Sequence, residues 1–134
     1  MTLDESRSLY DRPVHLGLGA TVIPQPRFTG PEWYGAYGAR NAGDGAEGRL
    51  VAMHRFDADW PSWEMHPAGA ELVVCVAGFM TVIQELPDGR ERRIDLREGD
   101  YAINPPGVWH TAQVREEATA LFVTSGLGTR HRPR

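Results

Sequence analysis

The sequence contains a single cysteine, Cys75, among its 134 residues. One cysteine excludes an internal disulfide framework and a zinc site built from thiolates. Any metal ion must therefore be bound through nitrogen and oxygen atoms. The length fits one domain, and a domain of this size can bury a hydrophobic core.

Long apolar runs and blocks of like charge are also missing. No stretch approaches the roughly 20 apolar residues of a membrane-spanning helix, and Met1-Thr2-Leu3-Asp4-Glu5 lacks the basic start and apolar centre of a signal peptide. The formal net charge is -4, with charges of both signs spread along the chain. This pattern argues against nucleic acid or an anionic membrane as the main partner. We therefore expect a cytoplasmic protein.

From Arg49 onward, short β-branched and apolar runs alternate with turn residues, which is typical of β-strands. The dipeptide Asp88-Gly89 is the strongest hairpin signal in the chain. Between the strands no segment shows a helical period. The predicted strands cover residues 50–56, 71–77, 79–85, 92–96, 101–103, 108–114 and 119–125. Short antiparallel strands at this spacing predict a sandwich or a barrel.

Residues 1–48 are rich in glycine and proline and predict an arm rather than a second domain. Within the arm, residues 20–23 and the aromatic stretch 33–37 look able to join a sheet. Its apolar side chains exceed what a solvated linker would carry: Tyr10, Val22, Ile23, Phe28, Trp33 and Tyr34. We expect them to cover the barrel or a neighbouring subunit, most simply in a homodimer. Residues 126–134, with three arginines, are expected to form a flexible tail.

The stretch 63–78 places ionisable side chains beside a strand. Glu71 begins a short apolar strand, and Glu64 and His66 share one face of the segment before it because side chains alternate along extended chain. The turn residues 67–69 can fold the two segments together and aim all three polar groups at one point. Buried charges are tolerated only when they are paired or bound to a cation. The stretch therefore predicts a metal site or a hydrogen-bonded network.

A second informative stretch covers residues 99–110, and together the two stretches resemble the paired motifs of the cupin superfamily. The first motif has the core H-x-H-x3,4-E-x6-G, and its second histidine, its glutamate and its glycine are matched by His66, Glu71 and Gly78. The second, G-x5-P-x-G-x2-H, is matched by Gly99, Pro105, Gly107 and His110. The resemblance covers residues 49 to 125. It implies an all-β fold, an antiparallel β-barrel or jelly roll over residues 49–125, preceded by the N-terminal arm 1–48 and followed by the flexible tail 126–134.

The resemblance also implies a set of metal ligands: His66, Glu71 and His110. Glu64 stands where the family usually has its first histidine, and Val114 stands where the second motif ends in asparagine. Glu64 is thus a fourth ligand, a general base on a metal-bound water or substrate, or a charged residue at the barrel mouth. Two imidazoles and a carboxylate suit a divalent first-row metal such as manganese, iron, nickel or zinc.

The same fold carries many functions, so the resemblance leaves the reaction open. One hypothesis is a metal-binding cupin that acts on, or binds, a small organic molecule in the barrel, with dioxygenase-like or isomerase-like chemistry. The alternative is a non-enzymatic module that binds or senses a small ligand, with a structural metal or none. Trp60, Trp63, Trp109 and His54 either line such a cavity or pack in the core. Cys75 is expected to be a small buried hydrophobe.

Overall fold

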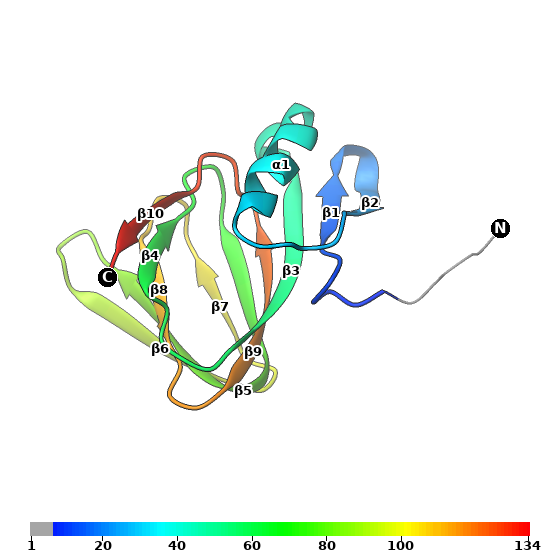
Figure 1. Cartoon of the computed structure of the whole chain (residues 1–134). Helices are drawn as coiled ribbons and strands as arrows, with labels where there is room; N and C mark the ends of the chain where they lie inside the picture. The colour runs from blue at the N-terminus through cyan, green and yellow to red at the C-terminus, as the bar shows by residue number, and fades with distance from the viewer. Residues whose placement is uncertain (1–6) are drawn as a thin grey trace.

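The computed structural model describes residues 7–134, which form ten β-strands, one α-helix and two 3₁₀ helices (Figure 1). The elements are β1 (Val14–Gly17), η1 (Leu18–Ala20), β2 (Thr21–Pro24), α1 (Glu32–Arg40), η2 (Ala42–Glu47), β3 (Arg49–Phe56), β4 (Ser62–Met65), β5 (Glu71–Glu85), β6 (Glu91–Arg97), β7 (Tyr101–Asn104), β8 (His110–Gln113), β9 (Ala118–Thr124) and β10 (Arg130–Pro133). No helix in this part of the chain has the length and apolarity to cross a membrane. The acidic opening residues 1–5 lie outside the described residues.

All strand pairs are antiparallel, and the long strand β5 belongs to two sheets. Its first half pairs with β7 and β9, and its second half pairs with β6 and β8. One sheet continues from β9 through β3 and β1 to β2, and the other continues from β8 through β4 to β10. This arrangement is a jelly roll, so the all-β antiparallel class predicted from the sequence is confirmed.

A bulge and a glycine let β5 pass from one sheet to the other. Glu71, Val73 and Cys75 point inward in strict alternation, but a register shift between Cys75 and Ala77 breaks the pattern. Ala77 is consequently exposed, although uninterrupted alternation would turn it inward. Gly78 follows with φ of +79°, a left-handed conformation that favours glycine.

We expect Gly78→Ala to destabilise the fold by more than about 3 kcal/mol. An L-residue in left-handed backbone costs roughly 1–2 kcal/mol, and a Cβ at Gly78 would lie 2.2 Å from the carbonyl oxygen of Glu117. Gly89→Ala is the matched control, because Gly89 has φ of +85° but no atom within 4 Å of the added Cβ. Urea denaturation should show the larger loss for Gly78→Ala, and equal losses would show that the contact with Glu117 does not matter.

The core lies between the two sheets. Its side chains come from β5 to β9 and the loop after β8: Val73, Cys75, Met80, Val82, Leu96, Ala102, Ala112, Val114, Ala118, Ala120 and Phe122. Cys75 is fully buried among them, as expected for a small hydrophobic residue. Because this core consists mainly of apolar side chains, the polar residues described below are not needed to form it.

The aromatic stretch of the arm forms a helix, so the prediction that residues 33–37 join a sheet is wrong. In α1 the side chains of Trp33 and Tyr37 are four residues apart and lie on one face, with stacked rings whose centroids are 5.4 Å apart. Trp33 is buried against Leu50 and Ala52 of β3. Packing on the sheet therefore stabilises a helix that contains two glycines and has little helical propensity of its own.

The arm is also tied to the sheet by strand pairing and by a buried histidine. β1 pairs with β3 and with β2, so residues 21–23 of the predicted stretch 20–23 join a sheet, whereas Ala20 ends η1. His15 is almost fully buried; its Nδ1 lies 2.6 Å from the hydroxyl of Tyr37 and its Nε2 lies 2.6 Å from a carboxylate oxygen of Asp44. These contacts place α1 at one end of the jelly roll, beside β3 (Figure 1).

The C-terminal segment differs from the expected flexible tail. Residues Arg130–Pro133 form β10, which pairs with β4. The guanidinium of Arg132 lies 4.6 Å from the ring centroid of Trp109 and 5.1 Å from that of Trp63, and it forms an ion pair with Glu85. Strand pairing and these cation–π contacts hold a segment whose composition alone suggests a solvated end.

Candidate metal centre

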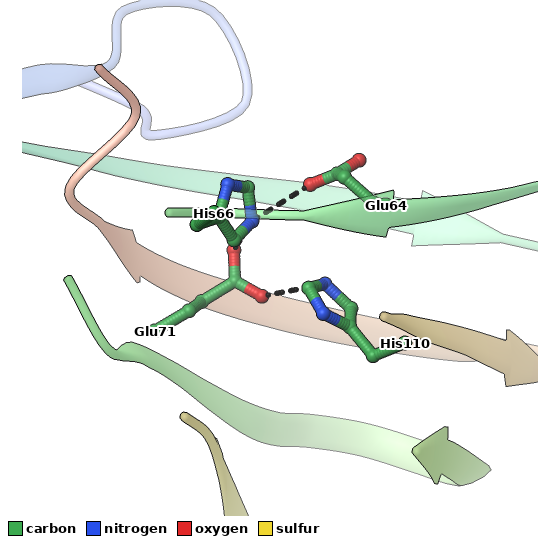
Figure 2. Close-up of side chains that lie close together, drawn as sticks. All are labelled: Glu64, His66, Glu71 and His110. Carbon is green, nitrogen blue, oxygen red and sulfur yellow. Dashed lines mark ion pairs between the residues drawn. The ribbon is translucent and has the colours of Figure 1, made fainter. Parts of the chain in front are cut away.

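Four side chains converge between the two sheets: Glu64, His66, Glu71 and His110 (Figure 2). Each offers one nitrogen or oxygen atom, and these atoms all lie within 4.8 Å of one another. Glu64 lies on β4, directly opposite His110 on β8. His66 follows β4, and Glu71 is the first residue of β5. The structure thus brings together the four residues singled out in the sequence.

The nitrogen atoms of the cluster face carboxylate oxygens. The Nε2 atom of His66 lies 3.0 Å from Oε1 of Glu64 and 3.1 Å from Oε2 of Glu71. The Nε2 atom of His110 lies 3.2 Å from Oε1 of Glu71. Among the described residues neither Nε2 atom has a hydrogen-bond partner of acceptable geometry, although both are buried. Buried polar atoms without a partner mark a place where a proton or a cation can bind.

The other ring nitrogen of each histidine fixes which nitrogen is free to coordinate. Nδ1 of His66 lies 2.8 Å from the hydroxyl oxygen of Thr129, and that hydroxyl donates to the carbonyl of Gly126 at 2.9 Å. The Thr129 oxygen therefore accepts from His66 Nδ1. Nδ1 of His110 lies 3.4 Å from the carbonyl oxygen of Val108, which can only accept. When either imidazole is neutral, its hydrogen therefore lies on Nδ1 and its Nε2 is free to coordinate.

Glu71 is 2% exposed, and neighbouring strands fix its carboxylate. Asn104 donates to its Oε1 at 3.1 Å, and Thr124 donates to its Oε2 at 2.7 Å. Asn104 and Thr124 are the residues opposite Glu71 on β7 and β9, and Gln84 in turn donates to the side-chain oxygen of Asn104 at 2.9 Å. Burial opposes ionisation, but His110 and His66 hold the pKa of Glu71 well below its usual range. The carboxylate is therefore charged.

The cluster attracts positive charge. Burial lowers the pKa of His66, but the carboxylates of Glu64 and Glu71 outweigh burial and raise it to about 9. A proton on Nε2 of His66 is one way to satisfy the two carboxylates. A divalent cation is the other, and two imidazole nitrogens with two carboxylate oxygens are a donor set that fits such an ion.

A cavity of about 910 Å³ adjoins the cluster. Its lining includes His54, Phe56, Trp60 and Phe122, together with Tyr34 of α1. The sequence left four residues either in the cavity lining or in the core, and two of them, Trp60 and His54, line the cavity. Trp63 and Trp109 instead pack on Arg132.

The C-terminal segment supplies a further wall of the cavity, which the sequence analysis missed. Thr129 and His131 both line it, and Nε2 of His131 lies 3.3 Å from Oε2 of Glu64. His131 stands directly opposite Glu64 in the pairing of β10 with β4. The spacing of two residues between Thr129 and His131 is the one signal in the sequence that could have placed both on one face of a strand.

No protein-family model matches the sequence, and no curated protein matches it. Solved structures do match. A two-residue deletion mutant of oxalate decarboxylase from Bacillus subtilis is 24% identical to this chain, with a TM-score of 0.54; the match covers 63% of this chain and 23% of the decarboxylase. Oxalate oxidase bound to glycolate is 15% identical, with a TM-score of 0.53; the match covers 61% of this chain and 45% of the oxidase. A cupin-2 domain-containing protein from Shewanella frigidimarina is 19% identical, with a TM-score of 0.49; the match covers 64% of this chain and 71% of that protein.

The sheet topology and the four-residue cluster together define a class of protein: a two-sheet antiparallel jelly roll with a candidate metal centre between the sheets. The chain has the fold of the cupin superfamily, which confirms the resemblance carried by the two sequence motifs. It spans less than half the length of the two oxalate enzymes.

Proposed function

We propose that the chain binds a divalent first-row metal ion through Glu64, His66, Glu71 and His110. The observation that carries this proposal is the convergence of two buried imidazole Nε2 atoms, which lack hydrogen-bond partners among the described residues, and two carboxylates at one point. Two carboxylates favour harder ions, so manganese or iron(II) suits the site better than copper, with nickel and zinc as further candidates.

We also propose that a small organic molecule binds in the adjoining cavity, beside the ion. When bound, a divalent metal supplies Lewis-acid polarisation of an oxygen atom of such a molecule. The protein holds Glu71 rigidly through Asn104 and Thr124. Glu64, whose side chain is 27% exposed, lies on the accessible side of the cluster, where its carboxylate can take a proton from a bound molecule. Dioxygenase-like and isomerase-like reactions both use such an arrangement.

Elemental analysis tests the metal site directly. Protein purified without added metal should contain about one divalent ion per chain, and chelation should remove the ion because three of its ligands, Glu64, His66 and Glu71, line the cavity. Preparations that never contain or take up a divalent ion would overturn the proposal.

The alternative function is a module that binds or senses a small ligand without a metal. It is favoured by the raised pKa of His66, about 9, because a proton there can satisfy Glu64 and Glu71. If a metal binds, it must displace this proton, so its apparent affinity should fall about tenfold for each pH unit below about 9. Titrations at two pH values, in buffers of different ionisation enthalpy, measure the slope and the released proton. A pH-independent affinity would remove His66 from the ligand set.

Thr129→Val should weaken metal binding by about 10–100-fold, the usual effect of removing a hydrogen-bond partner from a ligating histidine. Valine keeps the shape of threonine but cannot accept from His66 Nδ1, so the imidazole loses its fixed tautomer. Thr129→Ser is the control, because serine restores the hydroxyl and should restore the affinity. Equal affinities for the valine variant and the wild type in calorimetric titration would show that Thr129 does not orient His66.

We further propose that the protein is a homodimer that pairs through the arm. Phe28 and Trp33 pack on the chain's own barrel, but Val22 and Ile23 on β2 are 67% and 44% exposed. β2 lies at the end of its sheet, and an exposed apolar edge strand can pair with a second copy. Sedimentation that shows a monomer at micromolar concentration would contradict this dimer.

A further inference from the structure

The cavity beside the metal centre has an aromatic wall. Phe56, Trp60 and Phe122 are in mutual contact, with ring centroids 5.4, 5.9 and 6.1 Å apart. The ring of Trp60 also lies 6.4 Å from that of His110, so the wall reaches the candidate metal ligands. Flat ring systems interact best with other rings, through stacked or edge-to-face contacts. The wall therefore favours a planar aromatic ligand over a small or saturated one.

The charges that line the cavity disfavour an anionic ligand. Among the described lining residues, four carboxylates (Asp57, Asp59, Glu64 and Glu71) outnumber a single guanidinium, that of Arg55. With a divalent ion bound and His66 neutral, the formal charge of these side chains and the ion together is -1. Arg55 itself lies 3.5 Å from Glu117 and 5.2 Å from the ring centroid of Tyr10. Among the lining residues that the structure describes, a ligand carboxylate would find no free guanidinium or ammonium group, and leaving a charge without a partner in such a cavity is costly.

A neutral polar pair adjoins the aromatic wall. The hydroxyl of Tyr34 lies 3.2 Å from Nε2 of His54, and the ring of His54 lies 6.2 Å from that of Phe122. Burial lowers the pKa of His54, so its imidazole is neutral at pH 7. The pair offers hydrogen bonds but no charge, which again suits an uncharged ligand.

We propose that this site binds an uncharged aromatic molecule with a hydroxyl or carbonyl oxygen. Its ring contacts Phe56, Trp60 and Phe122, and its oxygen faces the metal centre. This inference rests on the proposed function, because it places that oxygen beside the ion. It also separates this chain from the oxalate enzymes that it resembles in fold, since a small dianion would meet the excess of carboxylates and leave the aromatic wall without a partner.

Calorimetric titration of the metal-loaded protein with four probes tests the ligand class. 2-Naphthol is the aromatic alcohol, 2-naphthoate is its anionic counterpart, decahydro-2-naphthol is its saturated counterpart, and oxalate is the small dianion. We expect 2-naphthol to bind roughly tenfold or more tightly than each of the other three. Metal content is measured on the same samples, so that occupancy is known for every titration.

Two phenylalanine variants provide a matched comparison. Phe122→Leu removes a ring from the cavity wall, whereas Phe79→Leu removes a ring from β5 outside the cavity lining. We expect Phe122→Leu to weaken 2-naphthol binding roughly tenfold and Phe79→Leu to leave it unchanged. Equal effects would overturn the aromatic wall as a binding surface.

The outcomes separate the ligand class from the metal proposal. If the protein holds metal but binds 2-naphthoate, decahydro-2-naphthol or oxalate at least as tightly as 2-naphthol, the ligand class is wrong and the metal site stands. If the protein holds no metal yet selects 2-naphthol, the metal site is wrong and the aromatic ligand class is upheld.

Discussion

His110→Ala is expected to lower metal affinity by more than about 100-fold. Loss of an outer hydrogen-bond partner of a ligand costs about 10–100-fold, so loss of a direct ligand should cost more. His110 is 1% exposed and its Nε2 atom lies 3.2 Å from Oε1 of Glu71, so its imidazole is held within the cluster. Metal analysis after purification and calorimetric titration with the metal measure the loss.

The barrel should still fold without His110. The apolar core lies among β5 to β9 and does not include this residue, and Asn104 still donates to the Glu71 oxygen that His110 faced. The far-ultraviolet spectrum should therefore match that of the wild type. His54→Ala is the matched control, because His54 lines the same cavity but lies outside the four-residue cluster. Full metal occupancy in His110→Ala would show that the ligand set is wrong.

The sequence predicted most strands because their signals are local. The hairpin between β5 and β6 turns at Asp88 and Gly89, and Gly89 has the positive φ that such turns require. The helix α1 could not be predicted in this way. Its two glycines weaken helical propensity, and its stability comes from Trp33 packing against β3, a contact between distant parts of the chain.

The four cluster residues were found because the two motifs fix their spacing, but their supporting residues were not. Asn104 and Thr124 bind Glu71 only because their strands pair with β5 in one register, which no local pattern specifies. Thr129 and His131 were missed because the arginine-rich end of the chain suggests a solvated segment. The contacts of Arg132 with Trp63 and Trp109 that hold it in place become visible only in the folded chain.

Glu64→Gln should reveal whether Glu64 is a metal ligand or a general base. Its Oε1 atom lies 3.0 Å from Nε2 of His66 and its Oε2 atom lies 3.3 Å from Nε2 of His131, so one oxygen points to the cluster and the other to the C-terminal wall. As a ligand, Glu64 supplies a negative charge that glutamine lacks. As a base, it accepts a proton that glutamine cannot take.

The two roles predict different results for metal content and for turnover. If Glu64 is a ligand, Glu64→Gln should weaken metal binding markedly, and Glu64→His, which adds a third imidazole, should hold the metal at least as well as the wild type. If Glu64 is a base, Glu64→Gln should keep its metal and lose about 10²–10⁴-fold in the rate of a metal-dependent reaction. Glu91→Gln on β6 is a control for the loss of one negative charge outside the cavity.

We favour the ligand role, because two carboxylates close to the same buried histidine repel each other unless a positive charge lies between them. A proton on His66 partly relieves this repulsion, and a divalent ion relieves it fully. Glu64→Gln should therefore also lower the pKa of His66 in the metal-free protein, since one of the two carboxylates that raise it is gone. Nuclear magnetic resonance titration of His66 measures that shift. If metal content, turnover and this pKa all stay unchanged in Glu64→Gln, Glu64 is only a charged residue at the cavity mouth.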